Sequence, residues 1–175
     1  MTQKFIIAGS GGQGIMLLGK VLAEAAMYEG NHVTWLPSYG AEVRGGTAHC
    51  SVVISDKPIG SPRIPFADTI IMMNSPSLDK FSGRLSPKGI AIVNSSLADD
   101  NFKKAGMLKF PFTDIASKIG NMKVANMVAL GCLIANIRTV KKETIIKVFE
   151  DLAPSGRRDL IDINKRALEE GMKLK

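Results

Sequence analysis

The sequence predicts a single α/β domain with a Rossmann-like three-layer fold, in which helices cover both faces of a mostly parallel sheet. Three observations lead to this prediction. The chain has 175 residues, which suits one domain with one large core. Hydrophobic residues make up 45% and charged residues 22%, as in folded globular proteins. Short apolar runs alternate with segments of helical periodicity, so we expect residues 1–175 to form one domain.

The N-terminal segment predicts a strand, a glycine-rich turn, a helix and a second strand. Residues 4–8 are an apolar run that predicts the first strand. From Ile15 onwards apolar residues recur at helical spacing, until Gly30 provides a stop signal. A second strand is expected at residues 32–36, and Pro37 is expected to end it. Together these elements form a βαβ unit.

The rest of the chain continues this alternation. Further strands are expected at residues 48–55, 69–73 and 89–94, with a weaker one at 107–111. Helices are expected at residues 76–81, 114–119, 125–137, 142–151 and 158–172. No internal repeat or low-complexity linker separates these segments. Strands that alternate with helices favour a mostly parallel sheet with helices packed on it.

The composition argues against several classes of protein. The longest apolar segment, residues 124–137, is too short to span a bilayer and contains Asn126, which we expect to cap the helix that follows. A strand pattern begins almost at the first residue without the features of a signal peptide, so a cytoplasmic protein without membrane contact is expected.

The two cysteines and two histidines do not suggest a metal site. Cys50 and Cys132 lie in apolar contexts without a C-x-x-C motif, so each is expected to be a small buried hydrophobe. His49 and Cys50 are adjacent in a predicted strand, and alternation places them on opposite faces of the sheet. We therefore expect no metal ligand in this chain.

The net charge is +7 at pH 7, and much of the excess lies near the C-terminus. There the basic residues alternate with acidic ones, and aromatic residues make up only 6% of the chain. Nucleic-acid binding would need a concentrated basic face, preferably with aromatic platforms. We interpret the C-terminal charges as a solvated helix surface and expect no nucleic-acid partner.

The glycine-rich turn after the first strand is the first candidate site. Gly9, Gly11 and Gly14 match G-x-G-x-x-G, and the turn also contains Gly12 and Gln13. Glycines at such a turn permit positive φ and bring backbone amides near the positive end of the following helix, where an anion is favoured. Gln13 is expected to point into the space above the turn. A ligand or partner contact is one interpretation, and a tight turn with close helix packing is the other.

The requirements of a dinucleotide site are not met. Such a site needs an acidic residue at the end of the second strand, but that strand ends in Leu36, Pro37 and Ser38. A Walker A loop is also excluded, because Gly14 is followed by Ile15 and not by lysine. A stand-alone nucleotide-binding regulatory or carrier protein remains an alternative.

A second glycine-rich segment follows the second strand, with the sequence PSYGAEVRGGTAHCSVVIS. It is expected to leave the sheet at the same carboxyl edge as the first turn, where open α/β sheets place their sites. Arginine suits bidentate recognition of carboxylate or phosphate, and tyrosine suits interfaces. The candidates that would face a cofactor, a substrate or a subunit from this segment are Ser38, Tyr39, Gly40, Glu42, Arg44, Gly45 and Gly46.

Four stretches together, GSGGQGIMLLGKVLAEAA, PSYGAEVRGGTAHCSVVIS, DKPIGSPRI and NMVALGCLI, resemble the gamma subunit of 2-oxoacid:ferredoxin oxidoreductases. The motif SYGAEVRGG followed by GSP is most similar to the 2-oxoglutarate (KorC-type) branch. The resemblance implies a multisubunit enzyme that converts 2-oxoglutarate and coenzyme A into succinyl-CoA and CO2 and reduces ferredoxin. A pyruvate- or branched-chain-type gamma subunit is the alternative within the family.

The resemblance also implies where the cofactors lie. Thiamine diphosphate, Mg and iron–sulfur clusters would belong to partner subunits, namely alpha, beta and a ferredoxin-like delta subunit, with coenzyme A as cosubstrate of the complex. This chain would bind no cofactor alone, carry no catalytic residue and be inactive by itself. Both glycine-rich segments would then face the alpha and beta subunits near the active centre. A purely structural subunit remains a further alternative.

Overall fold

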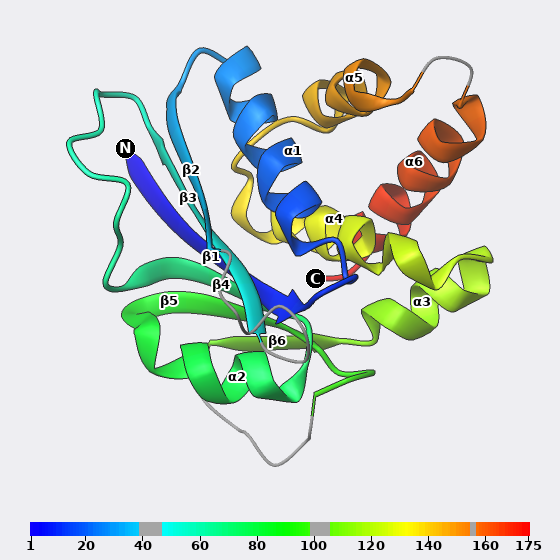
Figure 1. The fold of residues 1–175 in the computed structure, drawn as a ribbon, viewed down its shortest axis with the longest axis horizontal. Helices are drawn as coiled ribbons and strands as arrows, with labels where there is room; N and C mark the ends of the chain where they lie inside the picture. Colours follow the sequence, from blue (N-terminus) through cyan, green and yellow to red (C-terminus); the bar gives the residue numbers. More distant parts are fainter. Residues whose placement is uncertain (39–46, 99–105, 155–156) are drawn as a thin grey trace.

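The computed structural model describes residues 1–38, 47–98, 106–154 and 157–175. Within these ranges the chain forms one six-stranded sheet and six α-helices (Figure 1). The strands are β1 (Thr2–Ser10), β2 (His32–Ser38), β3 (Thr47–Ser55), β4 (Ala67–Met72), β5 (Leu85–Asn94) and β6 (Met107–Phe110). The helices are α1 (Ile15–Tyr28), α2 (Ser75–Phe81), α3 (Phe112–Ile119), α4 (Ala125–Ile137), α5 (Lys142–Leu152) and α6 (Arg158–Met172). Two 3-10 turns, η2 (Ser82–Arg84) and η3 (Met122–Val124), complete the described elements.

The strand order is β2-β3-β1-β4-β5-β6. β1, β4, β5 and β6 pair in parallel, which confirms the predicted mostly parallel sheet. β3 is the exception, because it pairs antiparallel with both β1 and β2. The short connection from β2 to β3 allows antiparallel pairing, whereas a parallel pair would need a long crossover. β1 and β2 therefore run in the same direction but are separated by β3.

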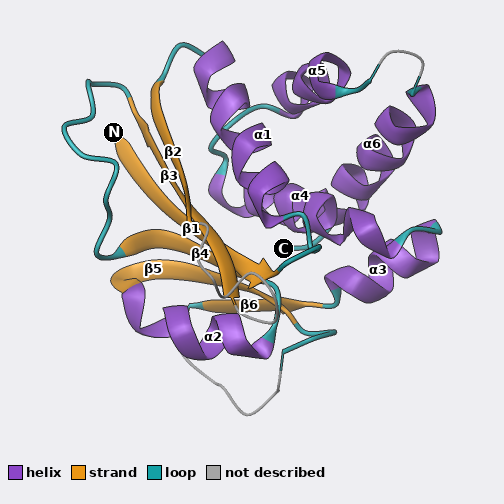
Figure 2. Cartoon of the chain, viewed as in Figure 1, coloured by secondary structure: helices purple, strands orange, loops and turns teal. Residues whose placement is uncertain are grey.

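Helices cover both faces of the sheet, as predicted, although unequally (Figures 1 and 2). α1, α4, α5 and α6 lie on one side, and α2 lies on the other. A large apolar core fills the space between the sheet and the α1 side, and a smaller one lies under α2. Side chains alternate between these two cores along β3: Cys50 belongs to the first and Val53 to the second.

The thiols behave as the sequence predicts. Cys50 and Cys132 are both buried, and burial raises the pKa of each thiol to about 12. His49 packs against Phe81 on the α2 side, with ring centroids 4.8 Å apart and the rings tilted by 48°, while Cys50 packs on the α1 side. The predicted placement of His49 and Cys50 on opposite faces is therefore confirmed.

Pro37 does not end the second strand, contrary to the sequence prediction. β2 continues to Ser38, and Pro37 pairs with Cys50 in the register of β2 with β3. β2 is at the edge of the sheet, where a strand bonds to one neighbour only. A proline whose missing N–H would face outwards breaks no ladder bond there.

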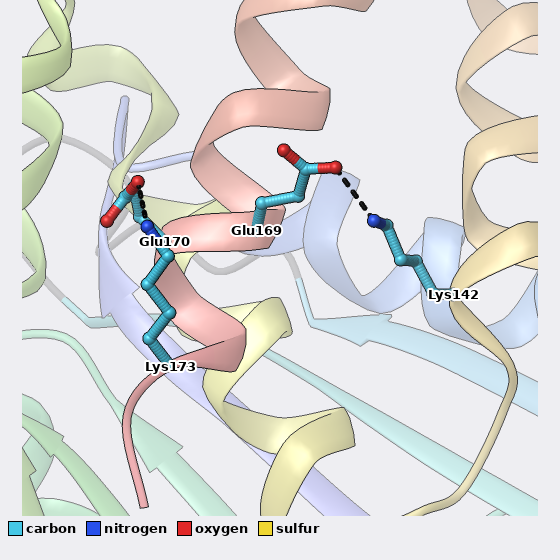
Figure 3. Close-up of polar contacts among 4 residues, drawn as sticks. All are labelled: Lys142, Glu169, Glu170 and Lys173. Atoms are coloured by element: carbon cyan, nitrogen blue, oxygen red, sulfur yellow. Dashed lines mark hydrogen bonds and ion pairs between the residues drawn. The ribbon is translucent and has the colours of Figure 1, made fainter.

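Oppositely charged side chains pair on the surface of the C-terminal helices (Figure 3). Lys142 pairs with Glu169 at 2.7 Å and Lys165 with Glu150 at 2.8 Å, and both pairs link α5 to α6. Lys173 pairs with Glu170 at 2.6 Å at the end of α6. Such exposed pairs each contribute roughly 0–1 kcal/mol. They agree with the interpretation of this region as a solvated helix surface. No helix among the described residues has the length and apolar character needed to cross a bilayer.

Two glycines allow α4 and α6 to pack backbone against backbone. A Cβ atom on Gly131 would lie 2.1 Å from the carbonyl oxygen of Leu168, and one on Gly171 would lie 2.0 Å from that of Val128. Both obstacles are backbone atoms of a neighbouring helix, which cannot turn aside as a flexible side chain can. The close helix pair therefore depends on the absence of a side chain at both positions.

We predict that Gly131→Ala lowers the free energy of unfolding by about 2 kcal/mol or more, because overpacking outweighs the gain of about 1 kcal/mol in helix propensity. Gly83→Ala is the control, since a Cβ at Gly83 meets no atom within 4 Å among the described residues. Urea unfolding followed by circular dichroism measures both. Equal midpoints for the two variants would show that the helices can separate without cost.

Candidate functional site

The turn between β1 and α1, residues 9–14, needs glycine at two positions because of the backbone itself. Gly12 has φ of 86° and Gly14 of 69°, in the left-handed region that glycine adopts most readily. Gly9 leaves room for a neighbouring side chain: a Cβ there would lie 2.6 Å from Oε1 of Gln13, which would have to move. Gly11 is exposed at the outer side of the turn. We call residues 9–14 the glycine corner.

Gln13 holds the glycine corner together. Its Oε1 accepts a hydrogen bond from the Ser10 amide at 2.7 Å, and its Nε2 donates to the Met73 carbonyl at 3.3 Å. The Gln13 amide proton also bonds to the Ser10 carbonyl at 3.2 Å. Both polar atoms of the side chain therefore already bond to the backbone. Gln13 also lines the hollow beside the corner, in line with the expectation that it points into the space above the turn, but its polar atoms already have backbone partners.

Asn126 joins α4 to the glycine corner. The sequence prediction that Asn126 caps the helix is wrong. α4 begins at Ala125, which places Asn126 inside its first turn. The Asn126 Nδ2 donates to the Gly14 carbonyl at 3.1 Å, and its Oδ1 accepts from the Met127 amide at 3.0 Å. The contact also explains Gly14, because a Cβ there would lie 2.3 Å from Nδ2 of Asn126.

Two asparagines at the ends of neighbouring strands extend this polar network. Asn74 follows β4; its Nδ2 donates to the Ser10 hydroxyl at 2.5 Å, and its Oδ1 accepts from the Ser77 amide at the start of α2. Asn94 ends β5 and donates through Nδ2 to the Met73 carbonyl at 3.2 Å. Neither asparagine was predicted from the sequence. Their signal is a polar amide directly at the carboxyl end of an apolar strand.

A hollow of about 210 Å³ lies beside the glycine corner. Gly12 and Gln13 line one part of it, and Leu97, Met122 and Lys123 line another. Leu97 is 46% exposed and Met122 is 64% exposed, so two large apolar side chains lie together at this hollow. The described lining contains no carboxylate, imidazole or thiol. This geometry suits the binding of an apolar surface and offers no pair of groups for acid–base or nucleophilic chemistry.

Two described residues of the second glycine-rich segment, Ser38 and Thr47, flank residues 39–46 and lie at the same edge of the sheet. Ser38 pairs with His49 across β2 and β3, and Thr47 pairs with Ser10 at the end of β1. Both flanking residues therefore lie at the edge that carries the glycine corner. The other candidates from this segment, Tyr39, Gly40, Glu42, Arg44, Gly45 and Gly46, lie outside the described residues.

The sheet order adds a further argument against a dinucleotide at the glycine corner. A dinucleotide site takes its ribose-binding acid from the strand next to the first one. Here β3 lies between β1 and β2, so Ser38 is two strand spacings away from β1, or about 10 Å. The end of β2 thus has no acidic residue, and it does not lie next to β1, where a ribose-binding acid would have to be.

The thiols do not suit an iron–sulfur cluster. A cluster is held by cysteine thiolates, typically four of them. The two cysteines of this chain lie in β3 and α4, and each is protonated near pH 7 because its pKa is about 12. Among the described residues, no three histidine, cysteine, aspartate or glutamate side chains gather closely enough to hold a metal ion.

We predict that Gln13→Ala lowers the free energy of unfolding by about 1–2 kcal/mol, because the Ser10 amide loses its side-chain acceptor and the Met73 carbonyl loses one donor. Lys123→Ala is the matched control, since Lys123 lines the same hollow with an exposed side chain. Chemical denaturation measures both. An unchanged free energy of unfolding for Gln13→Ala would mean that the hydrogen bonds of the Gln13 side chain do not stabilise the glycine corner.

Comparisons with known proteins identify the family. A family model described as pyruvate ferredoxin/flavodoxin oxidoreductase matches residues 4–174. The chain is 39% identical over 165 residues to the ketoisovalerate oxidoreductase subunit VorA of Methanothermobacter thermautotrophicus, covering 94% of this chain and 35% of that protein. The chain thus spans about a third of the length of this relative.

Other relatives match from end to end. The 2-oxoglutarate synthase subunit KorC of Methanocaldococcus jannaschii is 35% identical over 161 residues, which cover 89% of this chain and 86% of KorC. The keto/oxoacid ferredoxin oxidoreductase gamma subunit of Geobacter sulfurreducens superposes with a TM-score of 0.86 at 30% identity, covering 99% of this chain and 96% of that one. The resemblance to gamma subunits is confirmed, and the chain belongs to the pyruvate ferredoxin/flavodoxin oxidoreductase family.

Proposed function

We propose that this chain works as the gamma subunit of a multisubunit 2-oxoacid:ferredoxin oxidoreductase. That complex would convert a 2-oxoacid and coenzyme A into an acyl-CoA and CO2 and pass electrons to ferredoxin. The observation that carries the proposal is the end-to-end similarity to KorC and to the Geobacter sulfurreducens gamma subunit. Alpha, beta and delta subunits would hold the thiamine diphosphate, Mg and iron–sulfur clusters, because this chain offers two buried thiols and no built metal site among its described residues.

The chain's own contribution would be a docking surface at the carboxyl edge of the sheet. We define this corner surface as Gly12, Gln13, Leu97, Met122 and Lys123, which line one hollow. Exposed apolar side chains beside polar ones are typical of protein interfaces. The hydrogen bonds from Gln13 and Asn94 to the Met73 carbonyl fix the backbone beneath this surface. A fixed backbone favours binding of a partner subunit, because little conformational entropy is lost. The two residues that flank residues 39–46 lie at the same edge, and residues 39–46 would extend the surface towards the active centre.

Two substrate classes are candidates. The motif SYGAEVRGG favours 2-oxoglutarate as the substrate, in line with the 35% identity to KorC. The 39% identity to VorA favours a branched-chain 2-oxoacid such as 2-oxoisovalerate. We place 2-oxoglutarate first, because KorC matches this chain over nearly its whole length while VorA is about three times longer. The nucleotide-carrier alternative loses support, since Gln13 fills the corner and β3 separates β1 from β2.

Purification of the native complex through a tag on this chain tests the proposal. We expect larger catalytic subunits to copurify and the complex to reduce ferredoxin or a viologen dye with coenzyme A and 2-oxoglutarate. Parallel assays with 2-oxoisovalerate and pyruvate separate the substrate classes. A tagged chain that is recovered without partners from cells that produce it would contradict the proposed subunit role.

We predict that Met122→Glu reduces the recovery of partner subunits about tenfold or more, because a buried interfacial charge without a partner is costly. Met27→Glu is the matched control: Met27 is 60% exposed against 64% for Met122, but it lies near the far end of α1. Quantitative copurification measures both variants. Equal losses, or no loss for Met122→Glu, would show that the corner surface is not the docking face.

A further inference from the structure

A second hollow lies on the other face of the sheet, away from α1. It has a volume of about 540 Å³ and is bounded by β2, β3, the segment after β3 and the 3-10 turn η2, which follows α2. Strand alternation places Leu36, Ser38, His49 and Ser51 on this side, since Cys50 and Val52 face the α1 core. α2 covers the neighbouring part of the same face, where Phe81 packs against His49. We call this hollow the α2-side groove.

Its polar groups are hydrogen-bond donors. Ser38 and Ser51 provide hydroxyls, and Arg63 and Arg84 provide guanidinium groups, while no carboxylate lines the groove among the described residues. Within the part of the chain that the structure describes, Arg63 makes no ion pair. Among the described residues of the lining, no carboxylate therefore neutralises the positive charge of the groove.

Arg84 is held in place by the protein. Its Nε donates to the Pro65 carbonyl at 3.2 Å, and its Nη2 donates to the Ile64 carbonyl. The guanidinium carbon also lies 5.8 Å from the centroid of the Phe81 ring. These contacts fix the planar guanidinium group of Arg84 and use only some of its five N–H donors. A ligand would thus meet a guanidinium that is already ordered, with little further loss of side-chain entropy.

Ser51 adds a hydroxyl group to these donors. Only 9% of the residue is exposed, and it lines the groove, so its hydroxyl can donate a hydrogen bond to an oxygen atom bound there. Ser51 lies on the floor formed by β3, whereas Arg63 and Arg84 belong to the wall.

We propose that the α2-side groove binds a phosphate or diphosphate group, either as a free anion or as part of a nucleotide. Two guanidinium groups and two hydroxyls from separate segments donate towards one space, which matches oxygen atoms distributed around phosphorus. A planar carboxylate accepts along one edge and would leave some of these donors unused. The site is separate from the glycine corner and needs no other subunit, so it goes beyond the proposed function.

Isothermal titration calorimetry of the full chain with inorganic pyrophosphate, ADP and malonate tests this site. We expect saturable binding of pyrophosphate, with ADP binding as well if a nucleotide is the source, and much weaker binding of malonate. Arg63→Ala should weaken pyrophosphate binding about tenfold and Ser51→Ala about fivefold, from the loss of one charged and one neutral hydrogen bond. Arg158→Ala, an exposed arginine on α6, should leave the affinity unchanged.

Absence of saturable heat with both pyrophosphate and ADP would overturn the proposal. Malonate that binds as tightly as pyrophosphate would overturn the assignment to phosphate. Equal effects of Arg63→Ala and Arg158→Ala would also overturn it, because they would indicate attraction to overall charge. All variants are compared by thermal melting first, and Arg84 is left unchanged because it also holds Ile64 and Pro65.

Discussion

The Met73 carbonyl, directly after β4, accepts hydrogen bonds from Gln13 Nε2 at 3.3 Å and Asn94 Nδ2 at 3.2 Å. The Met73 amide in turn donates to the Ala8 carbonyl at 2.9 Å. One residue thus ties the ends of β1, β4 and β5 to the start of α1. Each bond contributes about 1 kcal/mol net, but a broken one would leave a polar group unpaired at a largely buried position. The shape of the carboxyl edge depends on this arrangement.

The protein carries two different surfaces, one at the carboxyl edge of the sheet and one on its α2 face. Beside the glycine corner, the side-chain amides of Gln13 and Asn94 form hydrogen bonds with the backbone. The apolar side chains of Leu97 and Met122 are exposed there, which suits contact with other subunits. On the α2 side, the lining combines hydroxyls with two arginines, which suits an anion. Close packing separates the two: a Cβ on Gly19 in α1 would lie 2.4 Å from Sγ of Cys50, so α1 sits directly on β3. The proposed docking and anion sites can therefore be changed independently.

The fold could be predicted from local patterns, because apolar runs and helical periodicity report burial directly. All predicted strands and helices are present, and the bounds of α4 and α6 agree with the sequence prediction. The antiparallel pairing of β3 was not predicted, since strand order depends on contacts between distant segments. The continuation of β2 through Pro37 follows from its edge position, which the sequence alone does not reveal.

The candidate site could be predicted less completely. The glycine corner was found because its spacing is local, but the partners of Gln13 and Asn126 lie 60 and 112 residues away. The same limit applies to Arg63 and Arg84, which belong to different segments and meet at one groove only in the folded chain. The roles of Glu42 and Arg44 remain predictions, because residues 39–46 lie outside the described ranges.

Hydrogen–deuterium exchange of this chain, alone and within the purified complex, tests the docking surface most directly. Slower exchange on assembly is expected at residues 11–17, 95–98 and 121–126, which surround the corner surface, with little change at residues 24–31 near the end of α1. Protection confined to the far end of α1, or no protection around the glycine corner in an intact complex, would contradict the account.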